Sequence, residues 1–409
     1  MAVTGTPQSD TNPCILLHGP HKSSLSTTHL PLPTLNEYPS DHVLLQIAYI
    51  GVCGSDVHFY THGGVGSDTT KYAQHQGNDF LGLVMGHEAS ATVLEVGKQA
   101  STLQAGDSVA IEPGIPCRTC PRCAEGMYNL CPDMHFAASF HTIRDPKTQS
   151  ITTGTTPGTL CKYYVLPESL CYKLPSDINL QEGVLVEPLA VAVHAARMVG
   201  INPVTVDTSK SLVVFGVGTV GILSAAVACA FGAGKVVIVD IDRQKLEFAK
   251  TWLGSASGAA TRAGAALHTI QSEIGVSPAD TARQIMAGCG LKAGADYVIE
   301  ASGAPSATAT GIHVLRSGGS MVQTGLAKKP AMDAFPIVDL SEKEIHLHGA
   351  FRYKIGDFAT AVDVLRRGLV GPVGELISKV FEFKEYEEAW KATRDGGGKG
   401  TKNLIKGPE

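Results

Sequence analysis

Residues 211–240 read SLVVFGVGTVGILSAAVACAFGAGKVVIVD, an order that predicts a strand, a glycine turn, a helix and a second strand. The apolar, β-branched runs at 211–217 and 235–240 predict buried strands, with a helix over about 219–232 between them. Residues 211–234 carry no charge, so their length alone would permit a membrane span. Five glycines and a β-type beginning favour the strand, turn and buried helix instead.

The glycine turn has the G-x-G-x-x-G spacing of dinucleotide sites, with glycines at 216, 218 and 221. Gly216 permits the tight turn, Gly218 lets the backbone approach a pyrophosphate, and Gly221 allows close packing of helix on strand. The helix N-terminus directs backbone N–H groups at the phosphates. Asp240, which follows Gly221 by 19 residues, can bind ribose hydroxyls and would repel a 2′-phosphate. We therefore expect NAD rather than NADP; a glycine turn without a ligand is the alternative.

Strands and helices continue to alternate toward the C-terminus. A helix is expected at 242–253 and 305–316, and a strand at 295–302 and 319–326. This alternation predicts an α/β Rossmann domain, a doubly wound parallel sheet, over residues 189–340. The Gly/Ala-rich segment 254–267 is interpreted as a linker or surface excursion.

The first part of the chain has a different pattern. Short β-like runs broken by Gly and Pro occur at 43–50, 89–97, 108–114 and 161–167. They predict a compact β-rich domain over residues 1–188. Two polar segments, 61–80 and 139–158, are interpreted as loop insertions of unknown role.

The tail, residues 341–409, contains a strand, a helix near 357–368 and a short strand near 377–383. So few elements cannot bury a core of their own. We therefore expect the tail to return to the first domain.

The length and charge of the chain exclude some classes of architecture and partner. A chain of 409 residues favours two domains, and 33 basic against 38 acidic residues leave a net charge of −5. This balance argues against nucleic acid or membrane as a partner. No secretory signal and no SKL-type ending is visible, so the expected location is cytoplasmic.

Four cysteines with short spacings mark a lobe at 112–133. Cys117-x2-Cys120-x2-Cys123-x7-Cys131 offers four thiolates, which close a tetrahedral zinc shell and leave no position for water. The lobe is therefore predicted to hold a structural zinc; free or redox-active thiols are the alternative. The other six cysteines are scattered and are interpreted as small buried hydrophobes.

A second metal group is spread along the chain. Cys53 in GVCGSDVH, His87 and Glu88 in GHE, and Glu187 in VEPLAVAVH offer ligands for a catalytic zinc, which needs three protein ligands and one open position. His87 and Glu88 are adjacent, so they can ligate together only if the chain bends at Gly86. Otherwise Glu187 is the third ligand. Singly, these residues could equally be core or surface.

Together these motifs resemble the zinc-dependent medium-chain dehydrogenases, in particular the polyol branch that contains sorbitol, xylitol and arabinitol dehydrogenases. The resemblance spans about residues 40–406. It rests on GVCGSDVHFYTHG, GHEASATVLEVG, YNLCP, LVEPLAVAVH, GVGTVG, ASGAPSATATGIHVLRSGG and GAFRY. PDMHFAASF, GIHVLR and the closing portion look most like the fungal xylitol dehydrogenases, or D-xylulose reductases.

The resemblance implies a GroES-like catalytic domain built from both chain ends, with the Rossmann domain between them. It implies that Cys53, His87 and Glu88 bind the catalytic zinc, and that Glu187 ligates it or holds its water. Ser55 and His58 correspond to the proton path, and Arg352 and Tyr353 to contacts with substrate hydroxyls. The implied coenzyme contacts are Gly216, Gly218, Val220, Gly221, Asp240, Lys245, Thr324, Gly325, Leu326, Ala350, Phe351 and Arg352.

Three positions depart from the family pattern. Phe59, on the substrate side, stands where sorbitol dehydrogenases have a tyrosine, so a hydroxyl contact is missing there. Thr219 replaces a proline of the glycine turn, which should be tolerated. Lys245 replaces an arginine near the adenosine ribose.

The resulting hypothesis is an NAD-dependent zinc enzyme that oxidises a small polyol, foremost xylitol to D-xylulose. Sorbitol, L-arabinitol or another secondary alcohol or diol are alternative substrates. A non-catalytic NAD-binding protein and a zinc hydrolase are alternatives from other classes. The resemblance also implies a homo-oligomer, a tetramer.

Overall fold

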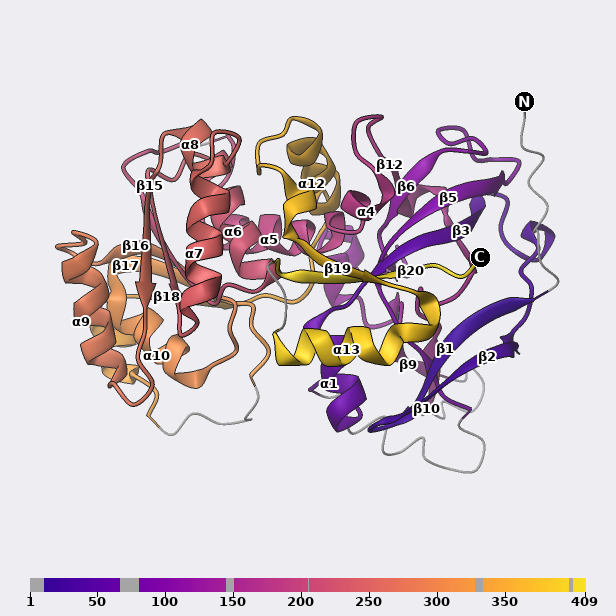
Figure 1. Cartoon of the computed structure of the whole chain (residues 1–409), viewed down its shortest axis with the longest axis horizontal. Coiled ribbons are helices and arrows are strands. Elements are labelled where there is room, and N and C mark those ends of the chain that lie inside the picture. Colours follow the sequence, from indigo (N-terminus) through magenta and orange to yellow (C-terminus); the bar gives the residue numbers. More distant parts are fainter. Residues whose placement is uncertain (1–10, 67–80, 145–150, 205, 328–333, 397–399) are drawn as a thin grey trace. The chain divides into compact units, whose positions relative to one another are not determined.

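The structure is a computed structural model that describes residues 11–66, 81–144, 151–204, 206–327, 334–396 and 400–409. The chain divides into two compact units (Figure 1). The first unit comprises Met1–Glu187, Ile377–Gly398 and Lys402–Glu409, and the second comprises Pro188–Leu376 and Lys399–Thr401.

The second unit is built on a six-stranded parallel sheet with the order β15-β14-β13-β16-β17-β18. Its strands are β13 Ser211–Phe215, β14 Lys235–Asp240, β15 Ala266–Gln271, β16 Ala295–Glu300, β17 Leu315–Gln323 and β18 His346–Gly349. Every residue of β13 is buried, as expected for a central strand covered on both faces. The strand order reverses between β13 and β16, which is the topological switch point of a doubly wound sheet.

Helices cover both faces of this sheet. The described helices of the unit are α5 Val186–Val199, which begins in the first unit, α6 Thr219–Ala230, α7 Arg243–Gly254, α8 Ala259–Ala263, α9 Pro278–Gly288, α10 Pro305–Val314, α11 Ile337–Glu342 and α12 Asp357–Arg366. Val213 and Val237 pack with Ile285 of α9 and Ile312 of α10 in one apolar cluster. Alternate residues of the strands face the other way, toward α6 and α7.

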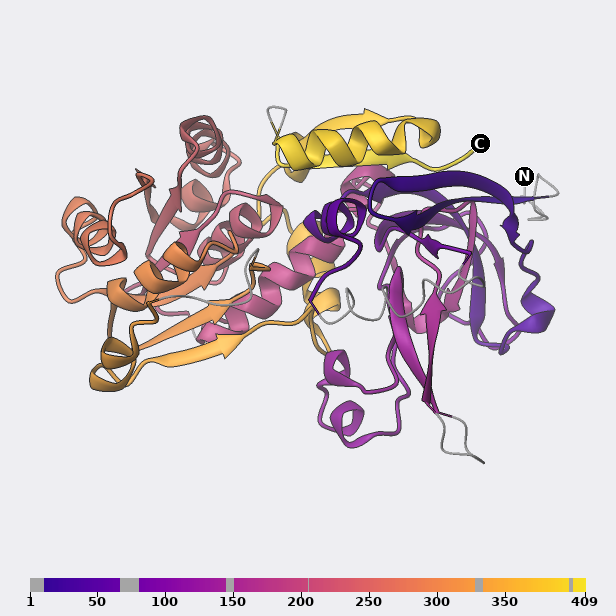
Figure 2. The ribbon, with the colours of Figure 1, turned by 90° about the horizontal axis from the view of Figure 1, so that it is seen from below.

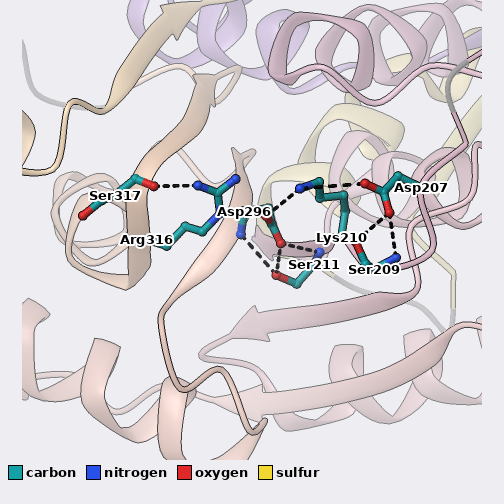
Figure 3. Close-up of polar contacts among 7 residues, drawn as sticks. All are labelled: Asp207, Ser209, Lys210, Ser211, Asp296, Arg316 and Ser317. Atoms are coloured by element: carbon teal, nitrogen blue, oxygen red, sulfur yellow. Dashed lines mark hydrogen bonds and ion pairs between the residues drawn. The ribbon is translucent and has the colours of Figure 1, made fainter.

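A polar network joins the amino ends of three strands of this sheet (Figure 3). Asp296 of β16 accepts hydrogen bonds from the Ser211 backbone N–H and hydroxyl of β13, both at 2.9 Å, and from Nε of Arg316 of β17 at 2.7 Å. The Lys210 ammonium lies 3.4 Å from the same carboxylate. Burial raises the pKa of Asp296, but these donors outweigh burial and hold the pKa below its usual range. The network therefore holds together the amino ends of the strands, and the glycine turn lies at their carboxyl ends.

The first unit contains a seven-stranded sheet with the order β12-β6-β5-β3-β20-β19, in which β11 also pairs with β3. Its strands are β3 His42–Gly51, β5 Glu88–Val96, β6 Ser108–Ile111, β11 Tyr163–Pro167, β12 Cys171–Lys173, β19 Ile377–Phe381 and β20 Lys402–Lys406. Smaller sheets contain β1 Asn12–Gly19, β2 Lys22–Leu30, β4 Leu83–Val84, β7 Gly114–Ile115, β8 His135–Phe136, β9 Ser139–Arg144 and β10 Ile151–Thr156.

The helices of the first unit are short. Those within the described residues are α1 Gly54–His62, α3 Pro121–Ala124, α4 Leu180–Gly183 and α13 Tyr386–Asp395. α13 packs against α1 and β20, so the C-terminal part of the chain completes the core begun by the N-terminal part. The segment around α3 extends away from the large sheet (Figure 2). None of the described helices combines the length and apolar character that a membrane crossing requires.

Three expectations need correction. The chain returns to the first unit at Ile377 rather than at residue 341, because β18 adds to the parallel sheet and α12 stays with it. The segment 254–267 is not a linker, because it contains α8 and runs into β15.

The expected loop 139–158 contains the paired strands β9 and β10. β10 is rich in Thr and β9 is largely polar, and for this reason the segment resembled a loop. Residues 67–80 of the other expected insertion, and residues 145–150 of this one, lie outside the described residues.

Candidate active site

Cys53, His87 and Glu88 bring their ligand atoms together in the first unit. The Cys53 Sγ, a ring nitrogen of His87 and a carboxylate oxygen of Glu88 all lie within 4.8 Å of one another. His87 and Glu88 can share a site because the backbone turns at Gly86, whose φ is 89°. A thiolate, an imidazole and a carboxylate are donors that zinc accepts while a fourth position stays open. These residues therefore fit a catalytic zinc.

Asp56 holds two of these ligands in place. It is the third residue of α1, and its Oδ2 accepts a hydrogen bond from the Cys53 N–H at 3.0 Å. Its Oδ1 lies 3.6 Å from Nδ1 of His87. Burial lowers the pKa of His87, but Asp56 and Cys53 outweigh burial and raise the pKa well above its ordinary value. Metal-ligating histidines usually donate their second ring nitrogen to a partner such as a carboxylate, and Asp56 fits that role.

Lys402 of β20 pairs with Glu88 from the far end of the chain. Its Nζ lies 2.8 and 2.6 Å from the two carboxylate oxygens and donates to the Val52 carbonyl at 3.2 Å. Both side chains are buried. Each carboxylate oxygen has two lone pairs, so the pair leaves acceptor capacity on Glu88 for a metal. Neither Asp56 nor Lys402 was predicted from the sequence.

Glu187 lies close to this site but outside the group within 4.8 Å. It is buried in the first turn of α5. Its charge contributes to the raised pKa of Lys402, after those of Glu88 and Cys53 and against the opposing effect of burial. The geometry therefore favours Glu88 over Glu187 as the third ligand.

Three further residues expected at the reaction site, Ser55, His58 and Phe59, lie on α1. Ser55 and His58 are half-buried and one helical turn apart, so they share a face of the helix. The His58 ring lies 5.7 Å from that of His62, between centroids. Phe59 is buried in the apolar core of the unit. The proton-path and substrate roles of these residues stay predictions.

The four cysteines of the lobe meet at one point. The Sγ atoms of Cys117, Cys120, Cys123 and Cys131 lie within 4.8 Å of one another, and no disulfide joins them. Backbone N–H groups of Thr119 and Cys120 lower the pKa of Cys117 to about 6, whereas burial raises that of Cys123 to about 12. A cation is needed to hold all four as thiolates, so the group fits a structural zinc.

The glycine turn in the second unit has the geometry of a phosphate cradle. Gly216 has a φ of 94°, and Gly218 is the N-cap of α6. A Cβ on Gly221 would collide with the Gly216 carbonyl oxygen, whereas a Cβ on Gly218 would meet nothing within 4 Å. The space above Gly218 is therefore open to a ligand. Val220 is half-buried in the first turn of the helix.

Asp240 ends β14 next to this turn. Its Oδ2 accepts a hydrogen bond from the Val217 N–H at 2.6 Å, and its Oδ1 accepts one from the Asp242 N–H at 2.9 Å. The carboxylate thus supports the turn and places a negative charge beside it. Lys245 is half-buried near the N-terminus of α7, where Asp242 caps the helix.

The remaining coenzyme candidates follow β17 and β18. The Thr324 and Gly325 N–H groups donate to the Glu300 carbonyl at 2.8 and 2.9 Å. The Ala350 N–H donates to the Gln323 carbonyl at 2.9 Å, so the two segments adjoin. Leu326 is half-exposed. The coenzyme role of these residues stays a prediction.

Phe351, Arg352 and Tyr353 follow directly. Phe351 is half-exposed, and the Arg352 guanidinium lies 4.5 Å from the centroid of its ring. Arg352 has a φ of 59°, a strained value of the kind found at functional sites. Tyr353, in contrast, is buried against Phe358, so its expected substrate contact stays a prediction.

Two family models match the chain. The alcohol dehydrogenase GroES-like domain matches residues 39–176, and the zinc-binding dehydrogenase domain matches residues 219–367. The first range lies in the β-rich unit, and the second contains five of the six strands of the parallel sheet, all except β13.

Curated relatives match over nearly the whole length. The chain is 42% identical over 396 residues to D-xylulose reductase A of Aspergillus niger, which covers 97% of both chains. It is 41% identical over 401 residues to D-xylulose reductase A of Aspergillus oryzae, which covers 98% of both.

Solved structures show the same fold. An oxidoreductase/dehydrogenase of unknown specificity from Escherichia coli superposes with a TM-score of 0.78 at 25% identity, covering 98% of this chain and 100% of that one. The L-idonate 5-dehydrogenase of Escherichia coli gives a TM-score of 0.75 at 28% identity, covering 97% and 98%.

Proposed function

Since the chain belongs to the zinc-dependent medium-chain alcohol dehydrogenase family, we propose that it oxidises xylitol to D-xylulose with NAD as the hydride acceptor. The observation that carries this proposal is the 42% identity to a D-xylulose reductase over 97% of both chains. The reverse reaction reduces the ketose with NADH.

The reactive site would use Cys53, His87 and Glu88 to hold a catalytic zinc, with Glu187 as a hydrogen-bond partner for a ligand in the open position. When bound, zinc supplies a Lewis acid that favours loss of a proton from an alcohol, and NAD supplies a hydride acceptor. Ser55 would receive the proton from the substrate hydroxyl and pass it to His58, one turn further along α1.

The coenzyme would bind at the glycine turn of the second unit. The open space above Gly218 and the N-terminus of α6 suit a pyrophosphate. The Asp240 carboxylate favours the free ribose hydroxyls of NAD over the 2′-phosphate of NADP. Thr324 to Leu326 and Ala350 to Arg352 would contact the nicotinamide half, and Lys245 the adenosine half.

Substrate specificity would depend on Phe59, Arg352 and Tyr353. The Arg352 guanidinium can donate to several polyol hydroxyls. The Phe59 ring cannot donate a hydrogen bond to a substrate hydroxyl. Sorbitol dehydrogenases carry a tyrosine at this position, so Phe59 favours a substrate other than sorbitol. Sorbitol, L-arabinitol and other secondary alcohols or diols are the second group of candidates.

A substrate panel tests the proposal. Protein of measured zinc content is incubated with xylitol, sorbitol, L-arabinitol and a simple diol, each with NAD and with NADP, and NADH or NADPH formation is followed. We expect the highest kcat/KM with xylitol and NAD, and loss of activity in Cys53→Ser. No turnover of any polyol or diol by zinc-loaded protein would refute the proposal.

Two finer points are also proposals. We propose a homotetramer from the family resemblance alone; β18, an edge strand of the six-stranded sheet that exposes Leu347, is a candidate for one of its interfaces. Light scattering of the purified protein tests the subunit number. The cytoplasmic location fits ten cysteines that form no disulfide, and cell fractionation tests it.

A further inference from the structure

Glu300 is a fully buried carboxylate at the switch point of the parallel sheet. It is the last residue of β16 and lies in register with Phe215, the last residue of β13. The strand order of the sheet reverses between these two strands, and ligands of doubly wound sheets bind outside the carboxyl ends of the strands at this point.

The Glu300 side chain holds two loops at once. Its Oε1 accepts hydrogen bonds from the backbone N–H groups of Ser302 and Gly303 at 2.8 and 3.0 Å, and from the Ser302 hydroxyl. Its Oε2 accepts from the Gly303 N–H at 3.1 Å and from the Gln323 side-chain amide. The carboxylate therefore links the loop after β16 to the end of β17.

The main chain of Glu300 reinforces the same link. Its carbonyl oxygen accepts from the N–H groups of Thr324 and Gly325 and, at 2.6 Å, from the Thr324 hydroxyl. The Gln323 amide that binds the carboxylate also donates to the Gly325 carbonyl at 2.9 Å. Both loops thus have their conformation set by one residue.

These two loops approach each other closely, and the first also approaches the glycine turn. A Cβ on Gly325 would lie 2.6 Å from Oε2 of Glu300 and would collide with the Gly303 nitrogen. A Cβ on Gly216, in the glycine turn, would lie 2.9 Å from both the Cβ and the nitrogen of Ser302. The loop after β16 therefore fills the space between the phosphate cradle and residues 324–326.

Among the residues that the structure describes, the donors to the Glu300 carboxylate are all neutral, and none of them is a cation that would compensate the burial of a charge. Burial raises the pKa of Glu300, and the hydrogen bonds from Ser302, Gly303 and Gln323 offset only part of this effect. A buried ionisable group without a counter-charge is costly for stability. Functional sites are where such costs are commonly found.

We propose that Glu300 is a positioning residue for the coenzyme, which sets the geometry of both loops against which the nicotinamide half of NAD binds. This inference rests on the proposed NAD-dependent function. Glu300 itself does not contact the coenzyme in this account; it acts through Ser302, Gly303 and the backbone of residues 324–325.

A carboxylate suits this task better than an amide. All the groups that approach the two oxygens are donors. Glu300→Gln would turn an NH₂ group either toward the N–H groups of Ser302 and Gly303 or toward those of Gly303 and Gln323, and in both orientations a buried N–H would lose its acceptor. Gln323 cannot flip to compensate, because its Nε2 also donates to the Gly325 carbonyl and its Oε1 accepts from Thr308.

The test uses the full-length, zinc-loaded protein, with Glu300→Gln and Asp296→Asn as the matched pair. Asp296 lies on the same strand, β16, near its amino end, whereas Glu300 ends it. The Asp296 carboxylate also accepts several hydrogen bonds (Figure 3). The Kd of NADH is measured by fluorescence titration, the Kd of AMP by calorimetry, and stability by thermal unfolding.

We expect Glu300→Gln to bind NADH roughly tenfold more weakly, as the loss of one or two hydrogen bonds implies. Its AMP affinity should be unchanged, because AMP occupies only the adenosine half beside Asp240. Asp296→Asn should lower the unfolding temperature and leave both affinities unchanged. In turnover, Glu300→Gln should raise the KM for NAD more than it lowers kcat.

Each other outcome has one meaning. If wild-type protein does not bind NADH, the proposed function fails. If it binds, and Glu300→Gln binds equally well, the role of Glu300 is refuted. The role is also refuted if NADH and AMP affinities fall together, or if Asp296→Asn loses NADH affinity as well. If Glu300→Gln does not fold, Gln323→Met, which removes the amide that joins the Glu300 carboxylate to β17, replaces it; unchanged NADH binding in that variant would equally refute the role.

Discussion

Lys402 and Glu88 are separated by 314 residues in the sequence, yet the Lys402 Nζ lies 2.8 and 2.6 Å from the two Glu88 carboxylate oxygens. Burial lowers the pKa of Lys402, but Glu88 and Cys53 outweigh burial and raise it, so the ammonium stays charged. The strand β20 thus supplies the cation that pairs with the Glu88 carboxylate of the candidate zinc site.

Lys402→Met should strongly destabilise the first unit. The substitution keeps the apolar stem but leaves the buried Glu88 carboxylate without a partner, which costs about 3–5 kcal/mol. The free energy of unfolding in urea measures this. Lys406→Met, on the same strand but in an exposed pair with Glu409, is the control and should be neutral. Equal stability of the two variants would contradict the importance of the pair.

Asp56→Asn should weaken zinc binding without unfolding the protein. The substitution keeps the size of the side chain but removes the charge that faces His87, and loss of such a partner typically reduces metal affinity about 10–100-fold. Zinc retention during titration with a chelator measures the effect. Asp41→Asn, whose carboxylate contacts His42 at the surface, is the control. Identical chelator curves would show that Asp56 does not support the ligand.

The predictions that agree with the structure rest on sequence patterns within short segments of the chain. The four cysteines of the lobe lie within one short segment, and so do the three glycines of the turn. Their proximity in space therefore depends little on the fold of the rest of the chain. The sequence left two alternatives for the third ligand, a bend at Gly86 that admits Glu88 or ligation by Glu187, and the positive φ of Gly86 agrees with the first. Asp56 was equally local, since it stands three residues after Cys53 in a capping box, and could have been found.

Long-range pairing could not be predicted in this way. Lys402 reaches Glu88 only because β20 pairs with β3 in the sheet, and nothing near Lys402 in the sequence signals a partner. Glu300 likewise resembled the end of an ordinary strand, because its donors come from a turn and from β17. The hairpin of β9 and β10 is held by backbone pairing, which leaves no apolar alternation to recognise.

Cys120→Ser should remove one zinc per chain and lower the thermal stability. One missing thiolate opens the tetrahedral shell, and the lobe around it has only a small core of its own. Metal analysis and thermal unfolding together measure the effect. Cys171→Ser, at a buried cysteine outside the group, controls for burying a hydroxyl and should keep its zinc. An unchanged zinc content in Cys120→Ser would refute the metal site.

Asp240→Asn should relax the preference for NAD. The amide oxygen can still accept the Val217 N–H and so keep the turn intact, but the charge that repels a 2′-phosphate is gone. The ratio of kcat/KM for NAD to that for NADP should fall about tenfold, as expected for one unit charge a few ångströms away. Asp242→Asn, at the neighbouring helix cap, is the control and should keep the wild-type ratio.

The lowered pKa of Asp357 implies that the second unit loses stability in acid. Burial raises its pKa, but hydrogen bonds from His194, the Lys354 N–H and Arg197 outweigh burial and hold the pKa below 3.8. A folded pKa below the unfolded one stabilises the protein above pH 3.8, and this contribution is lost as the pH falls further. Asp357→Asn should therefore lower the free energy of unfolding by about 2 kcal/mol near neutral pH, and the difference from wild type should shrink below pH 3.8. Asp363→Asn, on the exposed face of α12, should show a much smaller difference; a wild-type advantage that persists in acid would contradict the assignment.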